Sequence, residues 1–459
     1  MQEINIKKMN LPSYHDSEIE ASFNWFLSFM SEIHWNKRKL QIEKTVQIDF
    51  KENTPSDAFL SDMSALSIKD DSIGWYLYLV DCLLNDITKY EPIQGARIAP
   101  IFKRFGMDLE ILKNIEGIDI KIKKLLKSQK SQADSVLFEI LTALNWAKNG
   151  WEVSFIPEGK SGKSPDLFAK KNKEQWFIEC KRLSQNSDYS IAERNKWLKM
   201  LSYISSALIK YNLLLDIVFH VELETLNDDF LKEQLLDKFN LIETSVIKIS
   251  NEIWDVSITH VDLKSIDNHL KKFYVKNAST QLRYLIGGKH ADSIGFTSGI
   301  YAKYVAIGEN GGNNLYIEKI EQAYGVNWKC DAPNSINSKS RDIKYQLKKA
   351  IEQLPNNQNS AIHIGLETLD GTDVEKVRFD KILKTVSSFD IVPKKIKRLY
   401  CHFFQSYSPV DQTWVIDETI SWFSTEIPRN DYPLNEKFLI IPWDEKNEND
   451  NVHWLREQP

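Results

Sequence analysis

The segment "SPDLFAKKNKEQWFIECK", residues 164–181, constrains the fold of this 459-residue chain more than any other. Two runs of apolar residues flank the polar tip "KKNKEQ", a pattern that predicts a β-hairpin. Asp166 precedes the first strand, and Glu179 and Lys181 lie inside the second. Charged residues are poor strand formers and cost free energy when buried, so their presence here indicates a function.

The alternation of side chains along a strand predicts how these charged residues are arranged. Glu179 and Lys181 share one face, roughly 7 Å apart at about 3.3 Å per residue. Pairing of the two strands would bring Asp166 close to Glu179. Two converging carboxylates repel each other, and a bound divalent cation removes that repulsion; such oxygen ligands suit Mg²⁺ or Mn²⁺. Lys181 would then orient a metal-bound water and stabilise charge on a phosphate.

The elements around the hairpin are predicted to follow the order α-β-β-β-α-β. A helix at 131–150 precedes a strand at 151–157, the hairpin, a second amphipathic helix at 189–210 and an apolar strand at 213–223. The predicted fold class is therefore α/β.

This order, with Asp166 after Pro165 and then Glu179-Cys180-Lys181, resembles the PD-(D/E)XK nuclease superfamily, which has a restriction-endonuclease-like fold. The resemblance implies that Asp166, Glu179 and Lys181 are catalytic. It implies that Asp166 and Glu179 ligate Mg²⁺ or Mn²⁺ with the backbone carbonyl of Cys180. It also implies that Glu139, on the preceding helix, is a further ligand.

The resemblance covers only residues 131–223, so the rest of the chain is assigned by pattern alone. We predict a helical N-terminal region at 1–95, a nuclease-like domain at 96–225 with its core at 131–223, and a mixed α/β C-terminal domain of unknown role at 226–459.

The composition is that of a globular protein, with 42% hydrophobic and 27% charged residues. The net charge of −5 does not itself indicate nucleic acid, so any contact with nucleic acid depends on a local basic surface. Five basic residues near the proposed site are predicted to contact nucleic acid: Lys160, Lys163, Arg182, Arg194 and Lys196.

The cellular setting is predicted to be the cytoplasm. The four cysteines are widely separated and show no zinc-binding spacing, and no signal peptide opens the chain. The longest apolar run, residues 73–84, is interrupted by Asp81 and is shorter than the roughly 20 residues of a membrane span. We therefore expect no membrane partner.

These patterns predict a Mg²⁺-dependent phosphodiesterase, a deoxyribonuclease of the PD-(D/E)XK type. Its expected substrate is DNA rather than RNA, in restriction or defence against foreign DNA. Two alternatives stay open: a non-cutting nucleic-acid-binding or assembly protein that retains the fold, and an RNA-cleaving nuclease. Cutting of two strands by one site per chain would favour a homodimer, and a protein partner is also open, but no residue indicates an interface.

Overall fold

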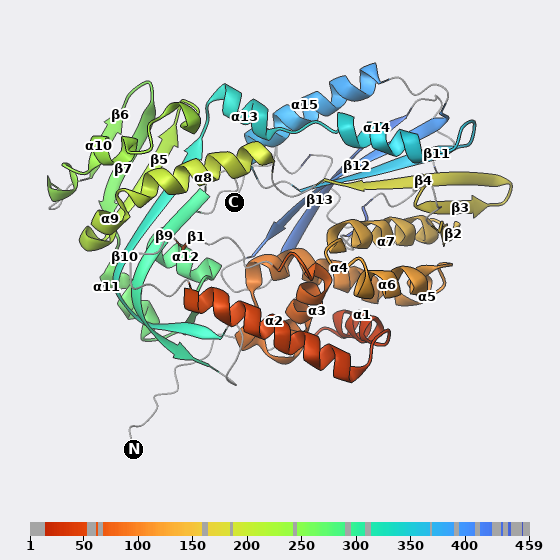
Figure 1. Ribbon diagram of the computed structural model, residues 1–459, viewed down its shortest axis with the longest axis horizontal. Coiled ribbons are helices and arrows are strands. Elements are labelled where there is room, and N and C mark those ends of the chain that lie inside the picture. The colour runs from red at the N-terminus through yellow and green to blue at the C-terminus, as the bar shows by residue number, and fades with distance from the viewer. Residues whose placement is uncertain are drawn as a thin grey trace.

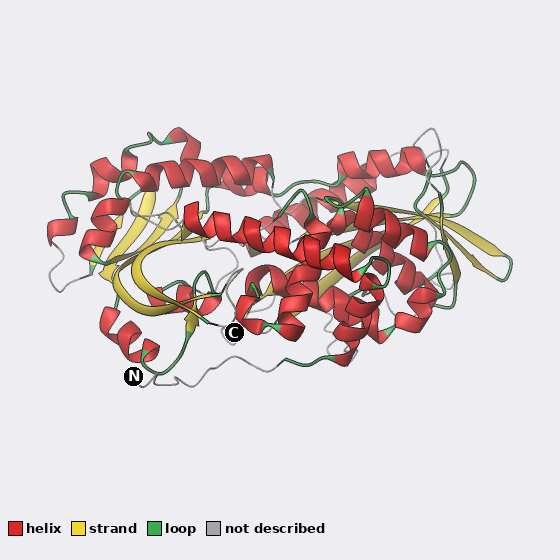
Figure 2. Cartoon of the chain, turned by 60° about the horizontal axis from the view of Figure 1, so that its bottom comes forward, coloured by secondary structure: helices red, strands yellow, loops and turns green. Residues whose placement is uncertain are grey.

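The computed structural model describes residues 14–52, 61–62, 68–157, 164–183, 187–241, 246–289, 295–307, 314–367, 370–389, 394–408, 414–424, 433–434, 439–441 and 452; of these, side chains are described except at 47–52, 61–62 and 241. The chain has an α/β architecture with two β-sheets. The sheets lie toward opposite ends of the long axis of the molecule, with helices packed around each (Figures 1 and 2).

The first part of the chain forms a group of helices beside the six-stranded sheet (Figure 1). Local sequence explains their starts: Asp16 accepts hydrogen bonds from the first amides of α1, and Glu91 does the same for α4, whose first residue is Pro92. Gly117 has a φ of 83° just before α6, a conformation that favours glycine. The helices are α1 (Ser17–Leu27), α2 (Glu32–Glu52), α3 (Ser72–Asn85), the short 3₁₀-helix η1 (Ile87–Lys89), α4 (Pro92–Met107), α5 (Leu109–Lys113) and α6 (Ile118–Lys127).

The six-stranded sheet contains the predicted hairpin. Its strand order is β13-β12-β11-β4-β3-β2. The strands β2, β3 and β4 pair antiparallel, β4, β11 and β12 pair parallel, and β13 is antiparallel to β12. The strands are β2 (Glu152–Phe155), β3 (Leu167–Lys171), β4 (Glu174–Arg182), β11 (Ser360–Glu367), β12 (Ile396–Tyr407) and β13 (Val415–Ser424).

Helices cover both faces of this sheet. On one face, Trp176 and Ile178 of β4 are buried in one apolar cluster with the apolar stripe of α7 (Ala133–Lys148). On the other face, Phe177 and Leu183 pack in a second cluster with α14 (Lys344–Gln353). The helices α13 (Pro333–Lys339) and α15 (Thr372–Ser388) lie beyond α14 along the same side (Figure 1). The hairpin is thus held from both sides.

The seven-stranded sheet is formed mainly by the middle of the chain. Its order is β1-β9-β10-β5-β7-β6, and β8 pairs with β10 off this path. The strands are β1 (Ser61–Asp62), β5 (Leu213–Phe219), β6 (Ile247–Ser250), β7 (Trp254–His260), β8 (Val275–Lys276), β9 (Gly295–Ala306) and β10 (Leu315–Cys330). The helices between or before them are α8 (Asp188–Ser202), α9 (Ser205–Tyr211), α10 (Phe230–Leu235), α11 (Leu263–Leu270) and α12 (Thr280–Ile286), with the 3₁₀-helices η2 (Leu223–Thr225) and η3 (Phe239–Leu241).

The prediction that the strand at 213–223 completes the hairpin's sheet is wrong. That strand, β5, lies between β10 and β7 of the other sheet, and β11 takes the place beside β4. Burial explains the choice. Alternate residues of β5 are only half-buried, whereas β11 is buried at every position, as a central parallel strand covered on both faces must be.

The predicted domain limits change with this strand. The strands from β5 to β10 belong to the other sheet. The next helix and strand of the hairpin's sheet are α14 and β11, which come later in the sequence. The strands β11, β12 and β13, expected in a separate C-terminal domain at 226–459, belong to the same sheet as β4. The unit around the hairpin is therefore not the continuous segment 131–223.

A chain of buried polar groups crosses the six-stranded sheet. Trp146 Nε1 donates to His363 Nε2 at 3.1 Å, His363 Nδ1 lies 2.9 Å from His402 Nε2, and His402 Nδ1 lies 2.7 Å from Glu418 Oε1. The indole can only donate, so His363 Nε2 accepts from it and His363 Nδ1 donates to His402 Nε2. His402 Nδ1 then donates to the Glu418 carboxylate, and each imidazole carries its proton on Nδ1. Glu418 also accepts the amides of Ile440 and Ile441, so the chain of bonds ties the C-terminal segment to the sheet.

We predict that a fragment of residues 96–225 does not fold alone. It contains α7 and the hairpin but lacks β11 and α14, so the parallel edge of β4 and the apolar face around Phe177 would be exposed. Circular dichroism during heating should show no cooperative transition for the fragment and a clear one for the full chain measured in parallel. A cooperative transition of the isolated fragment would contradict the described topology.

Candidate active site

Asp166 lies where the chain enters β3, close to β4. Its backbone amide donates to the Ile178 carbonyl at 3.1 Å, which fixes the start of the strand pairing. Its side-chain Oδ2 accepts a hydrogen bond from the Cys180 amide at 2.8 Å. The hairpin therefore brings Asp166 to the central part of β4, as its pairing predicts.

Glu179 and Lys181 form an ion pair on β4. Glu179 is fully buried, and its Oε1 contacts Lys181 Nζ. Lys181 also donates to Gln353 Oε1 at 2.5 Å, and Gln353 Nε2 donates to the Ser164 carbonyl at 3.2 Å. Gln353, the last residue of α14, thus links the lysine to the turn that carries Asp166.

Glu139 reaches the same region from α7. Its Oε2 contacts Nζ of Lys121, a residue of α6, and both side chains are largely buried. The Lys121 ammonium lies 5.8 Å from the centre of the Phe155 ring. The charges of Lys121 and Asp166 act on each other, so the pairs Lys121–Glu139 and Glu179–Lys181 flank one acidic centre.

Burial raises the pKa of all three carboxyl groups, and the charge of Asp166 raises the pKa of the other two further. Burial, followed by the charge of Asp166, raises the pKa of Glu179 to about 9. Burial and Asp166 also raise the pKa of Glu139 to about 7. Burial raises the pKa of Asp166 as well, although the bond from the Cys180 amide opposes this. Carboxyl groups perturbed in this way are typical of functional sites.

The donor set suits a hard divalent cation. Three carboxylates offer the oxygen ligands that Mg²⁺ and Mn²⁺ prefer, and no described amide or lysine donates to the buried Oε2 of Glu179. Within the described ranges, however, no three Asp, Glu, His or Cys side chains converge closely enough to enclose a metal ion. Lysines hold two of the carboxylates instead.

Cys180 packs its side chain into the apolar cluster of α7, next to the acidic centre. The thiol is buried in the cluster of α7, where it interacts with Thr142, and burial raises its pKa well above the usual value. The side chain is therefore a packing group. The ligand role of the Cys180 carbonyl stays a prediction.

The predicted nucleic-acid contacts are only partly placed by the structure. Arg182 does not face outward: it lies in a buried ion cluster and contacts Glu367, so its prediction as a nucleic-acid contact is corrected. Lys196 lies 2.7 Å from Asp228, and Arg194 is half-buried on α8. Lys160 and Lys163 lie outside the described residues.

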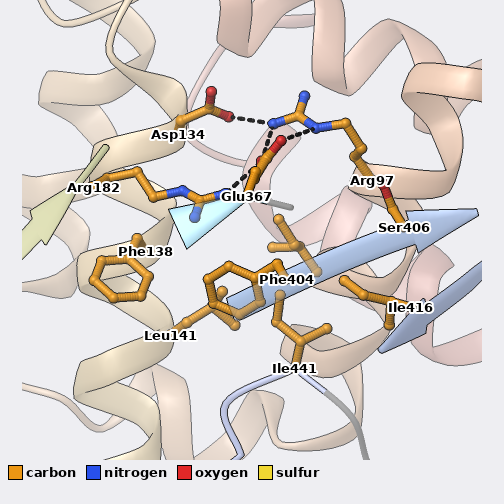
Figure 3. A pocket seen from close by; sticks show the side chains of 11 residues that line it. Arg97, Asp134, Phe138, Leu141, Arg182, Glu367, Phe404, Ser406, Ile416 and Ile441 are labelled. Atoms are coloured by element: carbon orange, nitrogen blue, oxygen red, sulfur yellow. Dashed lines mark hydrogen bonds and ion pairs between the residues drawn. The ribbon is translucent and has the colours of Figure 1, made fainter. Parts of the chain in front are cut away.

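Figure 3 shows this ion cluster, which joins α4, α7, β4 and β11. Arg97 forms a two-point contact with Glu367, with distances of 2.6 and 3.1 Å, and lies 3.4 Å from Asp134. Beside the cluster is a cavity of about 30 Å³, bounded below by apolar side chains such as Phe138 and Phe404. That volume accommodates a water molecule or two rather than an organic ligand. The cluster therefore fixes the helices against the sheet next to Lys181.

Sequence reasoning missed two residues of the site, Lys121 and Gln353. The basic segment at 121–130 was visible as a run of lysines, but nothing in it distinguishes Lys121 from its exposed neighbours. The strands β5 to β10 separate Gln353 from the hairpin along the sequence, and the sequence carries no signal for its position.

Comparison with known proteins gives limited overlap. No protein-family model and no solved structure matches the chain. Among curated proteins, a segment of 146 residues is 30% identical to a protein of Methanocaldococcus jannaschii named "Archaeal Rqc2 homolog aRqcH". The match takes in 30% of this chain and 21% of that protein, so the chain spans about a fifth of the relative.

This likeness overturns the prediction of a DNA nuclease. The relative is named as an Rqc2 homologue, which is a different class of protein from the restriction and defence nucleases predicted above. The expected preference for DNA has no support either. Separately, none of the helices in the described ranges is long and apolar enough to cross a membrane.

We predict that replacing Glu179 by glutamine flattens the pH dependence of stability. A carboxyl group whose pKa is raised on folding binds more protons when folded, so its contribution falls as the pH rises from 4.5 towards about 9. Without divalent cations, this group should lower the wild-type free energy of unfolding over that window by about 1–3 kcal/mol, and E179Q should lose that part of the decrease.

Urea unfolding at pH 5, 7 and 9 measures this effect. Glu174→Gln is the matched control, because Glu174 is an exposed carboxylate on the same strand. This substitution should leave the slope of unfolding free energy against pH unchanged. Equal slopes for wild type and E179Q would show that Glu179 is not held in the environment described.

Proposed function

We propose that this chain is an RNA-binding protein whose acidic site takes up Mg²⁺ or Mn²⁺ and hydrolyses RNA phosphodiester bonds. The observation that supports it is that three buried carboxyl groups with raised pKa, Asp166, Glu139 and Glu179, lie in one region beside Lys181. Burial of three acidic groups next to one another costs free energy and serves no packing purpose. A cation and a phosphate would use them.

The choice of RNA is supported by the likeness to the protein named "Archaeal Rqc2 homolog aRqcH". The likeness covers a short part of both proteins, so the substrate is part of our proposal. A cytoplasmic location belongs to the same proposal. It is supported by the four free, buried cysteines, as expected in a reducing compartment.

The order of elements around the site supports a restriction-endonuclease-like core. With α14 and β11 in place of α8 and β5, the chain reads α7-β2-β3-β4-α14-β11, which is the α-β-β-β-α-β order of that fold. In this interpretation an insertion between β4 and α14 forms the seven-stranded sheet except for β1. The match of order, and the positions of Asp166 and Glu179-Cys180-Lys181 within it, favour a site that acts on phosphodiesters.

Each residue has a role in the proposed mechanism. The cation would be held by Asp166, Glu179 and Glu139. It would polarise a phosphate oxygen and lower the pKa of a bound water. Lys181 would release Glu179, which would then bind the cation. The lysine would donate a hydrogen bond to the attacking water or to the phosphate. Gln353 holds the lysine near the turn of Asp166 and orients its ammonium.

A second function is favoured by one observation. Lysines pair with Glu139 and Glu179 in the structure described. If these pairs persist, the site binds no cation, and the protein would bind RNA without cutting it. The two functions share the RNA partner and differ in the requirement for a cation.

Cleavage assays with Lys181→Ala separate the two functions. Purified protein would be incubated with single-stranded RNA, structured RNA and DNA of the same sequence, with Mg²⁺, Mn²⁺ or EDTA. We expect cation-dependent RNA cleavage that falls by at least ~100-fold in K181A, because the group that stabilises charge is removed. Lys170→Ala is the control, since Lys170 is exposed on β3.

Each other result has a meaning. RNA binding with no cleavage in any cation would favour the non-cutting function. Neither binding nor cleavage of RNA would overturn the proposal as a whole. Cleavage that K181A retains would place the active site elsewhere.

The basic helix α6 is the surface that we propose for RNA. Lys124 and Lys127 are exposed on the helix that also carries Lys121 into the site. Replacing both with glutamate should weaken RNA binding and reduce the slope of log affinity against log salt by about 0.7 for each phosphate that the protein no longer neutralises. Fluorescence anisotropy at several salt concentrations measures both quantities. Lys232→Glu, an exposed change on α10, should alter neither.

A further inference from the structure

Lys121 is an unusual member of the acidic site, because it comes from outside both the hairpin and α7. It lies in α6, and its side chain is only 14% exposed. Its ammonium contacts Glu139 Oε2, faces the charge of Asp166 and lies over the ring of Phe155. A lysine held in this way lies beside two of the ligands proposed for the cation.

We propose that Lys121 is a built-in competitor for the divalent cation, and that the cation enters the site by displacing Lys121 from Glu139. This inference rests on the proposed function, because it concerns the cation site assigned there. It explains why the carboxylates do not converge around one point: Glu139 is turned to an ammonium in α6, and Glu179 is turned to Lys181.

The balance of charge favours displacement of one lysine. Three carboxylates carry three negative charges. A divalent cation and Lys181 together carry three positive charges, so the site is balanced when Lys121 has left. If Lys121 stayed, the site would hold four positive charges against three, and its ammonium would lie next to the cation. Like charges at such short range in a buried site repel strongly.

The position of Lys121 makes the exchange physically simple. The neighbouring residues Lys123 and Lys124 are exposed, so α6 lies at the surface beside the site. A change of side-chain rotamer would carry the Lys121 ammonium from Glu139 into solvent without movement of the helix. Lys181 has less freedom, because Glu179 and Gln353 both hold it. Lys121 is therefore the lysine that we expect to leave.

Calorimetric titration of the full chain with Mn²⁺ tests the competition. Lys121→Met removes the competitor and keeps the length of the side chain. It should bind Mn²⁺ about ten-fold more tightly than wild type. Lys130→Met removes an exposed charge just beyond the same helix and should change the affinity by less than about two-fold, because solvent screens that charge. In a Glu139→Gln background, K121M should have little further effect, because that background already lacks the ion pair.

A labelling measurement covers the case in which K121M does not fold. The wild-type protein is treated with an amine-acetylating reagent, with and without saturating Mn²⁺, and the modified lysines are counted by mass spectrometry. Mn²⁺ should raise the labelling of Lys121 several-fold and leave Lys124 unchanged.

The outcomes separate this inference from the proposed function. Tighter binding by K121M, or Mn²⁺-dependent labelling of Lys121, supports the competition. Mn²⁺ binding by wild type with unchanged or weaker binding by K121M, and no change in labelling, would overturn the competition and leave the cation site standing. Absence of Mn²⁺ binding in every variant would overturn the cation site itself.

Discussion

The parallel pairing of β4 with β11 is the contact on which the described six-stranded sheet depends. It places residues 177–182 beside residues 360–365, which are far apart in the sequence. The same pairing brings α14 over β4, and with it Gln353 to Lys181, and it brings Glu367 to Arg182. The residues between β4 and α14 can form a second sheet because the hairpin needs only the strand and helix that return after it. The acidic site is therefore assembled by contacts of long sequence separation.

Two groups of buried polar side chains in the described part of this sheet form connected sets. The Trp146–His363–His402–Glu418 chain has one consistent direction of donation, and Arg97 and Arg182 share Glu367. Such networks fix the position of the strands, since a shift of one residue would leave several groups without partners. The acidic site differs from them. Its three carboxyl groups keep raised pKa values in spite of two lysines, so their full ionisation is unfavourable and a bound cation would favour it.

The local part of the site follows from the sequence. Alternation along "WFIECK" predicts that Glu179 and Lys181 share a face, and hairpin pairing predicts that Asp166 lies near Glu179. The structure pairs Glu179 with Lys181 and bonds Asp166 to the amide of Cys180, the residue after Glu179. The helical periodicity of α7 likewise predicts which of its residues pack on the sheet, with Glu139 at the edge of that stripe. The substrate does not follow from these contacts. A charge pattern that resembles one superfamily does not identify the substrate, and the likeness to the Rqc2 homologue corrected the assignment to DNA cleavage.

The sequence by itself determined the elements whose pattern is local: the hairpin, its flanking helix and the alternating placement of charges. Only the tertiary structure decided which distant strand lies beside β4, because β5 and β11 are both short apolar strands and differ in how completely their two faces can be covered. It alone placed Lys121 and Gln353 at the site, since a single exposed-looking lysine or glutamine has no periodic signature. Hydrophobic periodicity acts within one element, whereas the burial of charge is decided by neighbours that any part of the chain can supply.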